Sequence, residues 1–116
     1  MNYSDQYILQ RGIQLSIQCY HLTETFPKSE LYGLTIKIRL SSVSVSSNIA
    51  EGYGRKTKAE YIHFIHIALG SLRELHTQLS IAQEINLATP ELLTSVLTEV
   101  DSLQQILVST IQKLKS

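Results

Sequence analysis

The residues best suited to metal chemistry are the histidines and one nearby glutamate. Glu60, His63 and His66 are spaced three apart, so on a helix they would share one face within reach of one another. Imidazole and carboxylate groups bind zinc, but a zinc site usually takes ligands from more than one helix. The other histidines, His21 and His76, have no such spacing. We therefore predict solvated or interfacial histidines, with no metal and no cofactor.

No arrangement of a nucleophile with a base is visible. None of the serines lies in a Gly-x-Ser-x-Gly turn, and Gly70-Ser71 falls inside an expected helix. The Gly52-x-Gly54 pair follows no strand, so it is not a phosphate-binding loop. No two carboxylates have an evident reason for a raised pKa. The residue pattern predicts that the protein is not an enzyme.

The densest basic cluster is Arg55, Lys56 and Lys58, between two expected helices. Such side chains neutralise phosphates, and the rings of the neighbouring Tyr53 and Tyr61 could stack on bases or ribose. Repeated around a symmetric assembly, the cluster would form a positive rim whose affinity comes from multivalency. The pattern thus indicates nucleic acid as one candidate partner.

Composition indicates a single domain over residues 1–116, because 43% hydrophobic residues are enough for one core. No apolar run approaches the ~20 residues of a membrane span, and the first residues lack signal-peptide features. The only cysteine, Cys19, is expected to be a small buried hydrophobe, and a cytoplasmic location fits this composition. Ten basic residues balance ten acidic ones, which argues against nucleic-acid binding, but basic residues dominate between Lys28 and Arg73.

Three breaks divide the chain into four segments: residues 26–29, 52–57 and 86–90. Pro27 disfavours helix at Phe26, and Ser29 is expected to cap the next helix. Gly54 is expected to close the second segment in the left-handed conformation. The caps expected for the third and fourth segments are a capping box from Thr57 to Glu60 and Thr89 followed by Pro90.

The third and fourth segments have apolar side chains at alternating spacings of three and four, the pattern of an α-helix with one buried face. In the third these are Tyr61, Ile65, Ala68, Leu72, Leu75, Leu79 and Ala82. In the fourth they are Leu93, Val96, Val100, Leu103, Leu107, Ile111 and Leu114.

The first two segments are ambiguous by pattern. Residues 13–19 and 36–40 alternate apolar and polar side chains, as strands do. Helical spacings are also present, in Leu9, Ile13, Ile17 and Tyr20 of the first segment and Leu31, Leu34, Ile38, Val45 and Ile49 of the second. Periodicity alone leaves both structures open.

The second segment has a further apolar face, because Ile36, Val43 and Ala50 are a heptad apart. A helix that is apolar on two faces needs two partners, and a second copy of the chain is the economical one. The alternative is a central helix buried on both sides.

Three other residues of these helices are candidates for structural or interface positions. Asn48 and Glu51 are polar groups in an apolar helix, and they are expected to bond neighbouring helices or to form a polar network at a subunit junction. Gly70 lowers helix stability by about 1 kcal/mol relative to alanine, so it is expected to face another helix backbone.

Two runs have a spacing that goes beyond general helix patterns: Ser47-Asn48-Ile49-Ala50-Glu51-Gly52-Tyr53-Gly54-Arg55 and Ala68-Leu69-Gly70-Ser71-Leu72-Arg73-Glu74-Leu75-His76-Thr77-Gln78-Leu79. Shorter matches occur at Phe26-Pro27-Lys28, Tyr32-Gly33-Leu34-Thr35 and Arg39. Over roughly residues 5–87 the chain thereby resembles the four-helix-bundle family encoded in intervening sequences of bacterial 23S rRNA genes. A relative within that family is the accessory protein of diversity-generating retroelements, which acts beside a reverse transcriptase.

The resemblance implies an all-α, antiparallel up-and-down four-helix bundle, and it decides for helix in the two ambiguous segments. It further implies a closed homo-oligomer, a pentamer in known members, with RNA or DNA as partner. The expected nucleic-acid-binding residues are Arg39, Arg55, Lys56 and Lys58. The alternative is a protein-interaction module, in which these basic residues serve only solubility.

Overall fold

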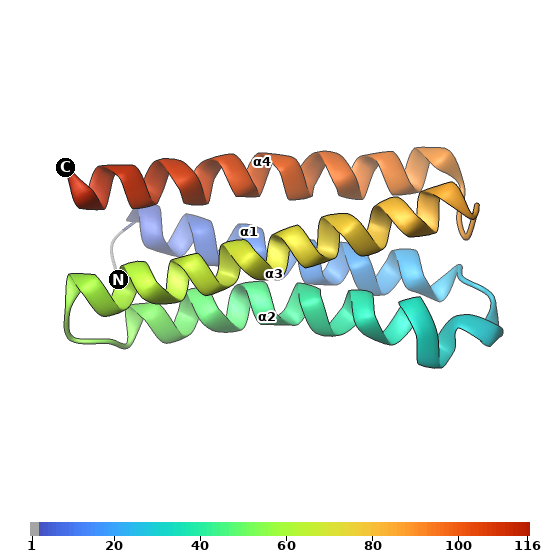
Figure 1. Ribbon diagram of the computed structural model, residues 1–116, viewed down its shortest axis with the longest axis horizontal. Coiled ribbons are helices and arrows are strands. Elements are labelled where there is room, and N and C mark those ends of the chain that lie inside the picture. The colour runs from blue at the N-terminus through green and yellow to red at the C-terminus, as the bar shows by residue number, and fades with distance from the viewer. Residues whose placement is uncertain (1–2) are drawn as a thin grey trace.

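The computed structural model describes residues 3–116 and contains four long α-helices joined by short connections (Figure 1). They are α1 (Tyr3–Glu24), α2 (Ile36–Tyr53), α3 (Lys58–Glu84) and α4 (Pro90–Lys115). Residues 3–116 include no strand, so the alternating stretches 13–19 and 36–40 are helical, as predicted. The first two residues of the predicted domain lie outside the described residues.

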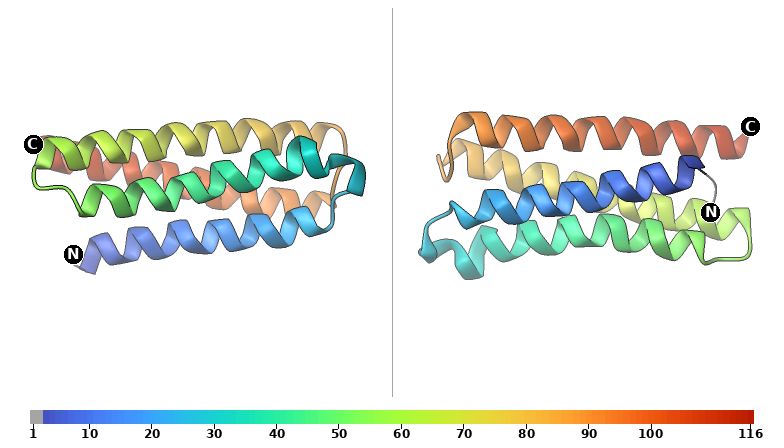
Figure 2. Two further views of the ribbon diagram at one scale, coloured as in Figure 1. Left: turned by 90° about the horizontal axis from the view of Figure 1, so that it is seen from below. Right: turned by 180° about the vertical axis from the view of Figure 1, so that it is seen from behind.

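The four helices form an antiparallel up-and-down bundle about 44 Å long and 22 by 20 Å across, which confirms the predicted fold (Figures 1 and 2). Successive helices lie side by side, and α4 packs against α1 to close the bundle. One end of the bundle holds the start of α1, the α2–α3 turn and the end of α4 (Figure 1); we call it the turn end. The other end holds the α1–α2 and α3–α4 connections, and we call it the loop end.

The α1–α2 connection is the longest irregular stretch. Helix α1 ends at Glu24, before the Phe26-Pro27 step. A 3-10 turn (Lys28–Glu30) and a π-helical segment (Leu31–Thr35), kinked at Gly33, then lead into α2. The predicted Ser29 cap is wrong, because Ser29 lies inside the 3-10 turn. Glu30 instead caps the π-helical segment, where its carboxylate accepts from the Leu34 N–H at 3.2 Å.

Helices α3 and α4 begin at the predicted residues, but only one of the two predicted caps forms a hydrogen bond. Thr57 Oγ1 accepts from the Glu60 N–H at 3.1 Å, as expected of its capping box. Thr89 stands before Pro90, but its side chain makes no capping hydrogen bond.

The left-handed residue occurs at a different helix end from the predicted one. Gly54 has φ −79° and ψ −6°, so the predicted left-handed closure of α2 is wrong. In this right-handed conformation the Gly54 N–H donates to the Glu51 carbonyl at 3.1 Å and closes the helix. Asn86 is left-handed instead, with φ 58°. The Leu87 N–H then donates to the Ala82 carbonyl at 3.0 Å and closes α3.

The core contains most of the predicted apolar faces of α3 and α4, buried from Ile65 to Ala82 and from Leu93 to Ile111. Tyr61 and Leu114, at the turn end of these two faces, are only partly buried. On α2, Ile38, Val45 and Ile49 are buried as predicted. In the π-helical segment before α2, Leu34 is partly buried against the core, whereas Leu31 is exposed.

For α1 the predicted face is wrong, because Ile13, Ile17 and Tyr20 are each more than a third exposed. The buried face is Ile8, Leu15, Cys19 and Leu22. The reason is Gly12, which lies on the same side as these residues and lets α1 approach α2 closely; a Cβ there would be 3.3 Å from Ser46 Cβ.

Candidate nucleic-acid interface

The turn end gathers exposed basic side chains from two distant parts of the sequence. Arg55, Lys56 and Lys58 lie at the α2–α3 turn, and Lys113 and Lys115 lie in the last turn of α4. Leu114 lines the same shallow hollow as Arg55, Lys56 and Lys58, so the end of α4 lies beside the α2–α3 turn. Sequence reasoning missed the two α4 lysines, although the antiparallel order of four helices would have placed them here.

Of the three turn residues, Arg55 is already engaged within the chain. Its guanidinium donates to Glu51 Oε1, four residues earlier, at 2.7 Å and lies 4.7 Å from the centre of the Phe64 ring. Within residues 3–116, no ion pair within 4.0 Å involves Lys56 or Lys58. These two lysines are therefore the better-placed cations for an external phosphate.

Tyr53 and Tyr61 hold the turn against the start of α1. The Tyr53 hydroxyl donates to the Asp5 carbonyl, and the Tyr61 hydroxyl donates to Asp5 Oδ1 at 2.9 Å. Their ring centres are 5.3 Å apart. Burial raises the pKa of Tyr53 to about 12, and burial together with the hydrogen bond to Asp5 raises the pKa of Tyr61. Both side chains thus have a structural role. The sequence pattern placed Tyr61 on the apolar face of the third segment, but it did not indicate the role of Tyr53 or the contact of either residue with Asp5.

Arg39 is not near the other three predicted residues. It lies in the first turn of α2, about 21 Å along the helix from Tyr53 at 1.5 Å per residue, and Arg55 follows beyond that end of α2. Its Nε donates to Thr23 Oγ1 at 2.8 Å, and its guanidinium lies 4.7 Å from the centre of the Tyr20 ring. The structure therefore brings together Arg55, Lys56 and Lys58 but leaves Arg39 at the loop end.

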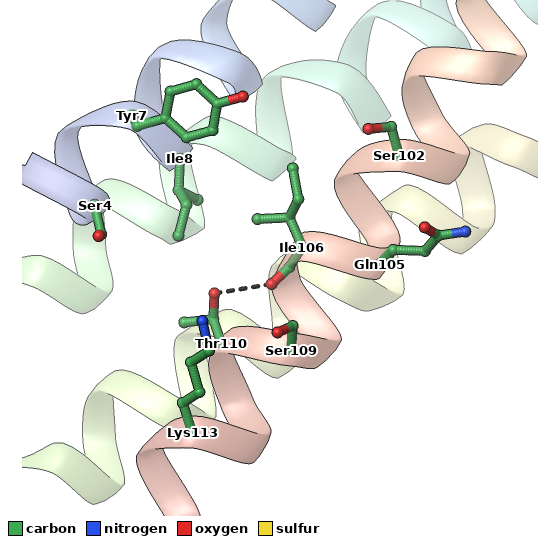
Figure 3. A pocket seen from close by; sticks show the side chains of 9 residues that line it. All are labelled: Ser4, Tyr7, Ile8, Ser102, Gln105, Ile106, Ser109, Thr110 and Lys113. Carbon is green, nitrogen blue, oxygen red and sulfur yellow. Dashed lines mark hydrogen bonds between the residues drawn. The ribbon is translucent and has the colours of Figure 1, made fainter.

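A trough of about 400 Å³ runs between the start of α1 and the end of α4 (Figure 3). Its lining includes Tyr7, Ile8, Ser102, Ile106, Thr110 and Lys113, and we call it the α1–α4 trough. Arg11 holds the two helices together beside it.

Three hydrogen bonds position Arg11. Its Nε donates to Glu99 Oε1 at 2.7 Å, its Nη2 to Ser102 Oγ at 3.0 Å, and its Nη1 to the Tyr7 hydroxyl. The bond to Glu99 raises the pKa of Arg11 above its ordinary value. Sequence reasoning missed this site, because its residues come from opposite ends of the chain.

The second apolar face of α2 is exposed in the single chain. Ile36 and Val43 are 41% and 40% exposed, Ala50 is also exposed, and Leu40 between them is 64% exposed. We call these four residues the α2 outer face. The alternative of a helix buried on both sides is therefore wrong within one chain, and this face has no partner among residues 3–116.

The polar residues Asn48 and Glu51 do not bond neighbouring helices directly, contrary to expectation. Asn48 Nδ2 donates to the carbonyl and the hydroxyl of Ser44, at 2.8 and 3.1 Å. The Ser44 hydroxyl in turn shares a 2.8 Å hydrogen bond with that of Ser71 on α3. Asn48, which is half-buried, thus reaches α3 only through Ser44, and the exposed Glu51 bonds Arg55.

Gly70 does not face another helix of this chain, so that prediction is wrong within the chain. A Cβ built at Gly70 would meet no heavy atom within 4 Å. The close helix approaches occur at Gly12 and at Gly52, where a Cβ would be 3.0 Å from Tyr61 Cδ1.

The histidines lie toward the surface of the bundle. His63 and His66 are exposed on α3, and His76 Nε2 is 3.4 Å from Asp101 Oδ1. Within the described part of the chain, no group of three His, Cys, Asp or Glu side chains is placed to hold a metal ion. None of the described helices is long and apolar enough to cross a membrane.

Comparison with solved structures shows the same fold. A crystal structure from Bacteroides thetaiotaomicron, of a protein of unknown function from the S23 ribosomal protein family, matches with a TM-score of 0.87. The match covers 94% of this chain and 98% of that one, at 19% sequence identity. No curated protein sequence matches the chain. The family model for the 23S rRNA-intervening sequence protein matches residues 4–109, so the chain belongs to that family.

Proposed function

We propose that this protein is a non-enzymatic helical bundle that binds RNA through its turn end. The supporting observation is the gathering of five exposed basic side chains at that end: Arg55, Lys56, Lys58, Lys113 and Lys115. Three acidic side chains, Asp5, Glu51 and Glu60, lie there too. The turn end is thus net positive on a chain with zero net charge.

A single turn end is a weak phosphate-binding surface, so affinity is expected to depend on repetition. The α2 outer face is the surface that would supply it, because four exposed apolar side chains on one helix are typical of a protein–protein contact. We propose that copies associate through this face into a closed ring, most simply the pentamer that the family resemblance implies. Several turn ends would then contact one RNA strand together.

The test is a fluorescence anisotropy titration with a mixed-sequence single-stranded RNA at increasing salt. Replacing Lys56 and Lys58 with alanine should weaken binding and flatten the log–log salt slope by about 0.7 for each phosphate that the variant no longer neutralises. The matched control is Lys28→Ala with Lys37→Ala, which removes the same charge from two exposed lysines away from the turn end. Equal effects of the two double variants would contradict the proposed interface.

A protein partner is the second candidate function, and the exposed α2 outer face supports it equally well. A reverse transcriptase is one such partner that the resemblance implies. If the wild-type protein does not bind the RNA pool at micromolar concentration and low salt, the RNA proposal fails and this candidate stands.

A further inference from the structure

We propose that the α1–α4 trough binds one unpaired nucleotide of a single-stranded RNA. This inference rests on the proposed RNA-binding function and adds to it the class of nucleic acid and the site of one base. Three features of the trough carry it: the shape, the arrangement of hydrogen-bond donors and acceptors, and continuity with the turn end.

The shape fits a flat ring with an apolar face. Ile8 from α1 and Ile106 from α4 reach into the space between the helices, and the Tyr7 ring extends over it (Figure 3). The Arg11 guanidinium lies 5.5 Å from the centre of the Tyr7 ring, yet Tyr7 is 47% exposed, so part of the ring surface is open to a ligand. A base stacked in a duplex cannot offer its face to this ring, whereas an unpaired base can.

The hydrogen-bonding groups beside Tyr7 are fixed as donors. Arg11 donates to the oxygens of Tyr7 and Ser102. Each hydroxyl therefore keeps its own proton for another acceptor. Base carbonyls, ring nitrogens and phosphate oxygens are such acceptors, so this end of the trough suits a nucleotide.

Thr110 has the opposite polarity. Its hydroxyl donates to the Ile106 carbonyl at 2.8 Å (Figure 3), so it offers only lone pairs to the trough. The 2′-hydroxyl of ribose can donate to such an acceptor, and deoxyribose has no such group. The trough is thus expected to favour RNA over DNA.

Lys113 connects the trough with the turn end. It lines the trough beside Thr110 (Figure 3), and the last turn of α4 that holds it lies at the same end of the bundle as the α2–α3 turn with Lys56 and Lys58 (Figure 1). A strand whose phosphates contact the turn end can therefore extend along the end of α4 toward the trough. An apolar peptide side chain would fill the same space but would leave the hydroxyls of Tyr7 and Ser102 without acceptors.

The test measures four probes by fluorescence anisotropy and competition: a ten-nucleotide single-stranded RNA, the DNA of the same sequence, the matching RNA duplex, and uridine monophosphate. The wild-type protein should bind the single-stranded RNA most tightly. Tyr7→Leu should weaken it roughly fivefold or more without changing the salt slope, because base stacking and phosphate contacts are separate contributions. The control Tyr32→Leu removes a 90% exposed ring that lies outside the trough.

A second pair of variants tests the ribose contact. Thr110→Val should reduce the preference for RNA over DNA toward equality. Thr98→Val is the matched control, because Thr98 also donates to the carbonyl four residues before it at 2.8 Å but lies elsewhere on α4. The control should leave the preference unchanged.

The outcomes separate the trough from the basic surface. If Lys56→Ala with Lys58→Ala weakens RNA binding but Tyr7→Leu and Thr110→Val do not, the trough proposal is overturned and the proposed function stands. Preference for the duplex, or uridine monophosphate binding as tightly as the RNA, would also overturn it. If the wild-type protein binds no RNA, the proposed function fails and this inference fails with it.

Discussion

Cys19 is held as an unreactive, protonated thiol. It is fully buried on the core side of α1, and this burial raises the pKa of its thiol to about 12, although a hydrogen bond with Ser42 acts in the opposite direction. Only the thiolate reacts with disulfide reagents. We expect the folded protein at pH 8 to react with such a reagent at least about a hundredfold more slowly than the protein in denaturant. Equal rates would show that this face of α1 is open to solvent.

Tyr53 and Tyr61 make stability depend on alkaline pH. Both have a raised pKa in the folded state, about 12 for Tyr53 against about 10 when unfolded. The protonated hydroxyls therefore stabilise the fold fully below about pH 10. The Tyr53 contribution is lost as the pH rises to about 12, and the Tyr61 contribution also falls across this range, because its pKa is raised further.

The measurement is the thermal unfolding temperature of wild type and a Tyr53→Phe, Tyr61→Phe double variant across pH 9 to 12. The wild-type temperature should fall more steeply, because phenylalanine has no proton to lose. Tyr32→Phe, at a 90% exposed ring, is the control and should follow the wild type. Parallel curves for all three proteins would contradict the assignment.

Small residues decide where the helices approach one another. Gly12 and Ser46 bring α1 to α2, and Ser44 and Ser71 share a hydrogen bond between α2 and α3. Close approach lets backbones pack tightly, but it leaves no room for a larger side chain. Substitutions at these positions therefore report on the helix–helix geometry.

Gly70 and Gly12 are expected to respond oppositely to alanine. Gly70→Ala gains about 1 kcal/mol of helix propensity, and its new Cβ meets no atom within 4 Å. The thermal unfolding temperature should therefore rise by about 4 °C. Gly12→Ala has the same gain, but its Cβ would be 3.3 Å from Ser46 Cβ and would push α1 and α2 apart. Calorimetry on both variants checks this. A less stable Gly70→Ala protein would show that something outside the chain covers Gly70.

The helices differ in how well the sequence predicts them. In α3 and α4 the apolar spacing has only one good helical solution, so both elements and their buried faces were predictable. In α1 two apolar faces compete, and the choice depends on Gly12, whose effect appears only when α2 is beside it. The apolar spacing of a sequence predicts the buried face of a helix only where the helix has a single apolar face.

At the scale of the whole molecule, the order of the helices in the bundle determines which residues of the candidate site lie together. The turn cluster Arg55, Lys56 and Lys58 was visible as a run in the sequence, because its members are close along the chain. The α1–α4 trough was not, because Tyr7 and Thr110 come from opposite ends of the sequence. Arg39 shows the reverse: it belongs to the basic half of the chain, yet the fold places it at the loop end.

Assembly is the property of the whole molecule that the α2 outer face predicts. Val43 is 40% exposed in the single chain, and in a ring of copies it would be buried against a neighbour. Val43→Glu should therefore dissociate the assembly, because a carboxylate would be buried without a partner. Val108→Glu is the matched control: Val108 is 38% exposed but lies on α4.

Light scattering gives the subunit number of each protein, and circular dichroism shows whether its helices are intact. We expect assembled wild type and Val108→Glu, and a folded Val43→Glu monomer. That monomer should also bind RNA more weakly, although its turn end is unchanged, because a single turn end cannot bind one strand multivalently. A monomeric wild type would contradict the assembly and leave the turn end of one chain as the whole RNA-binding surface.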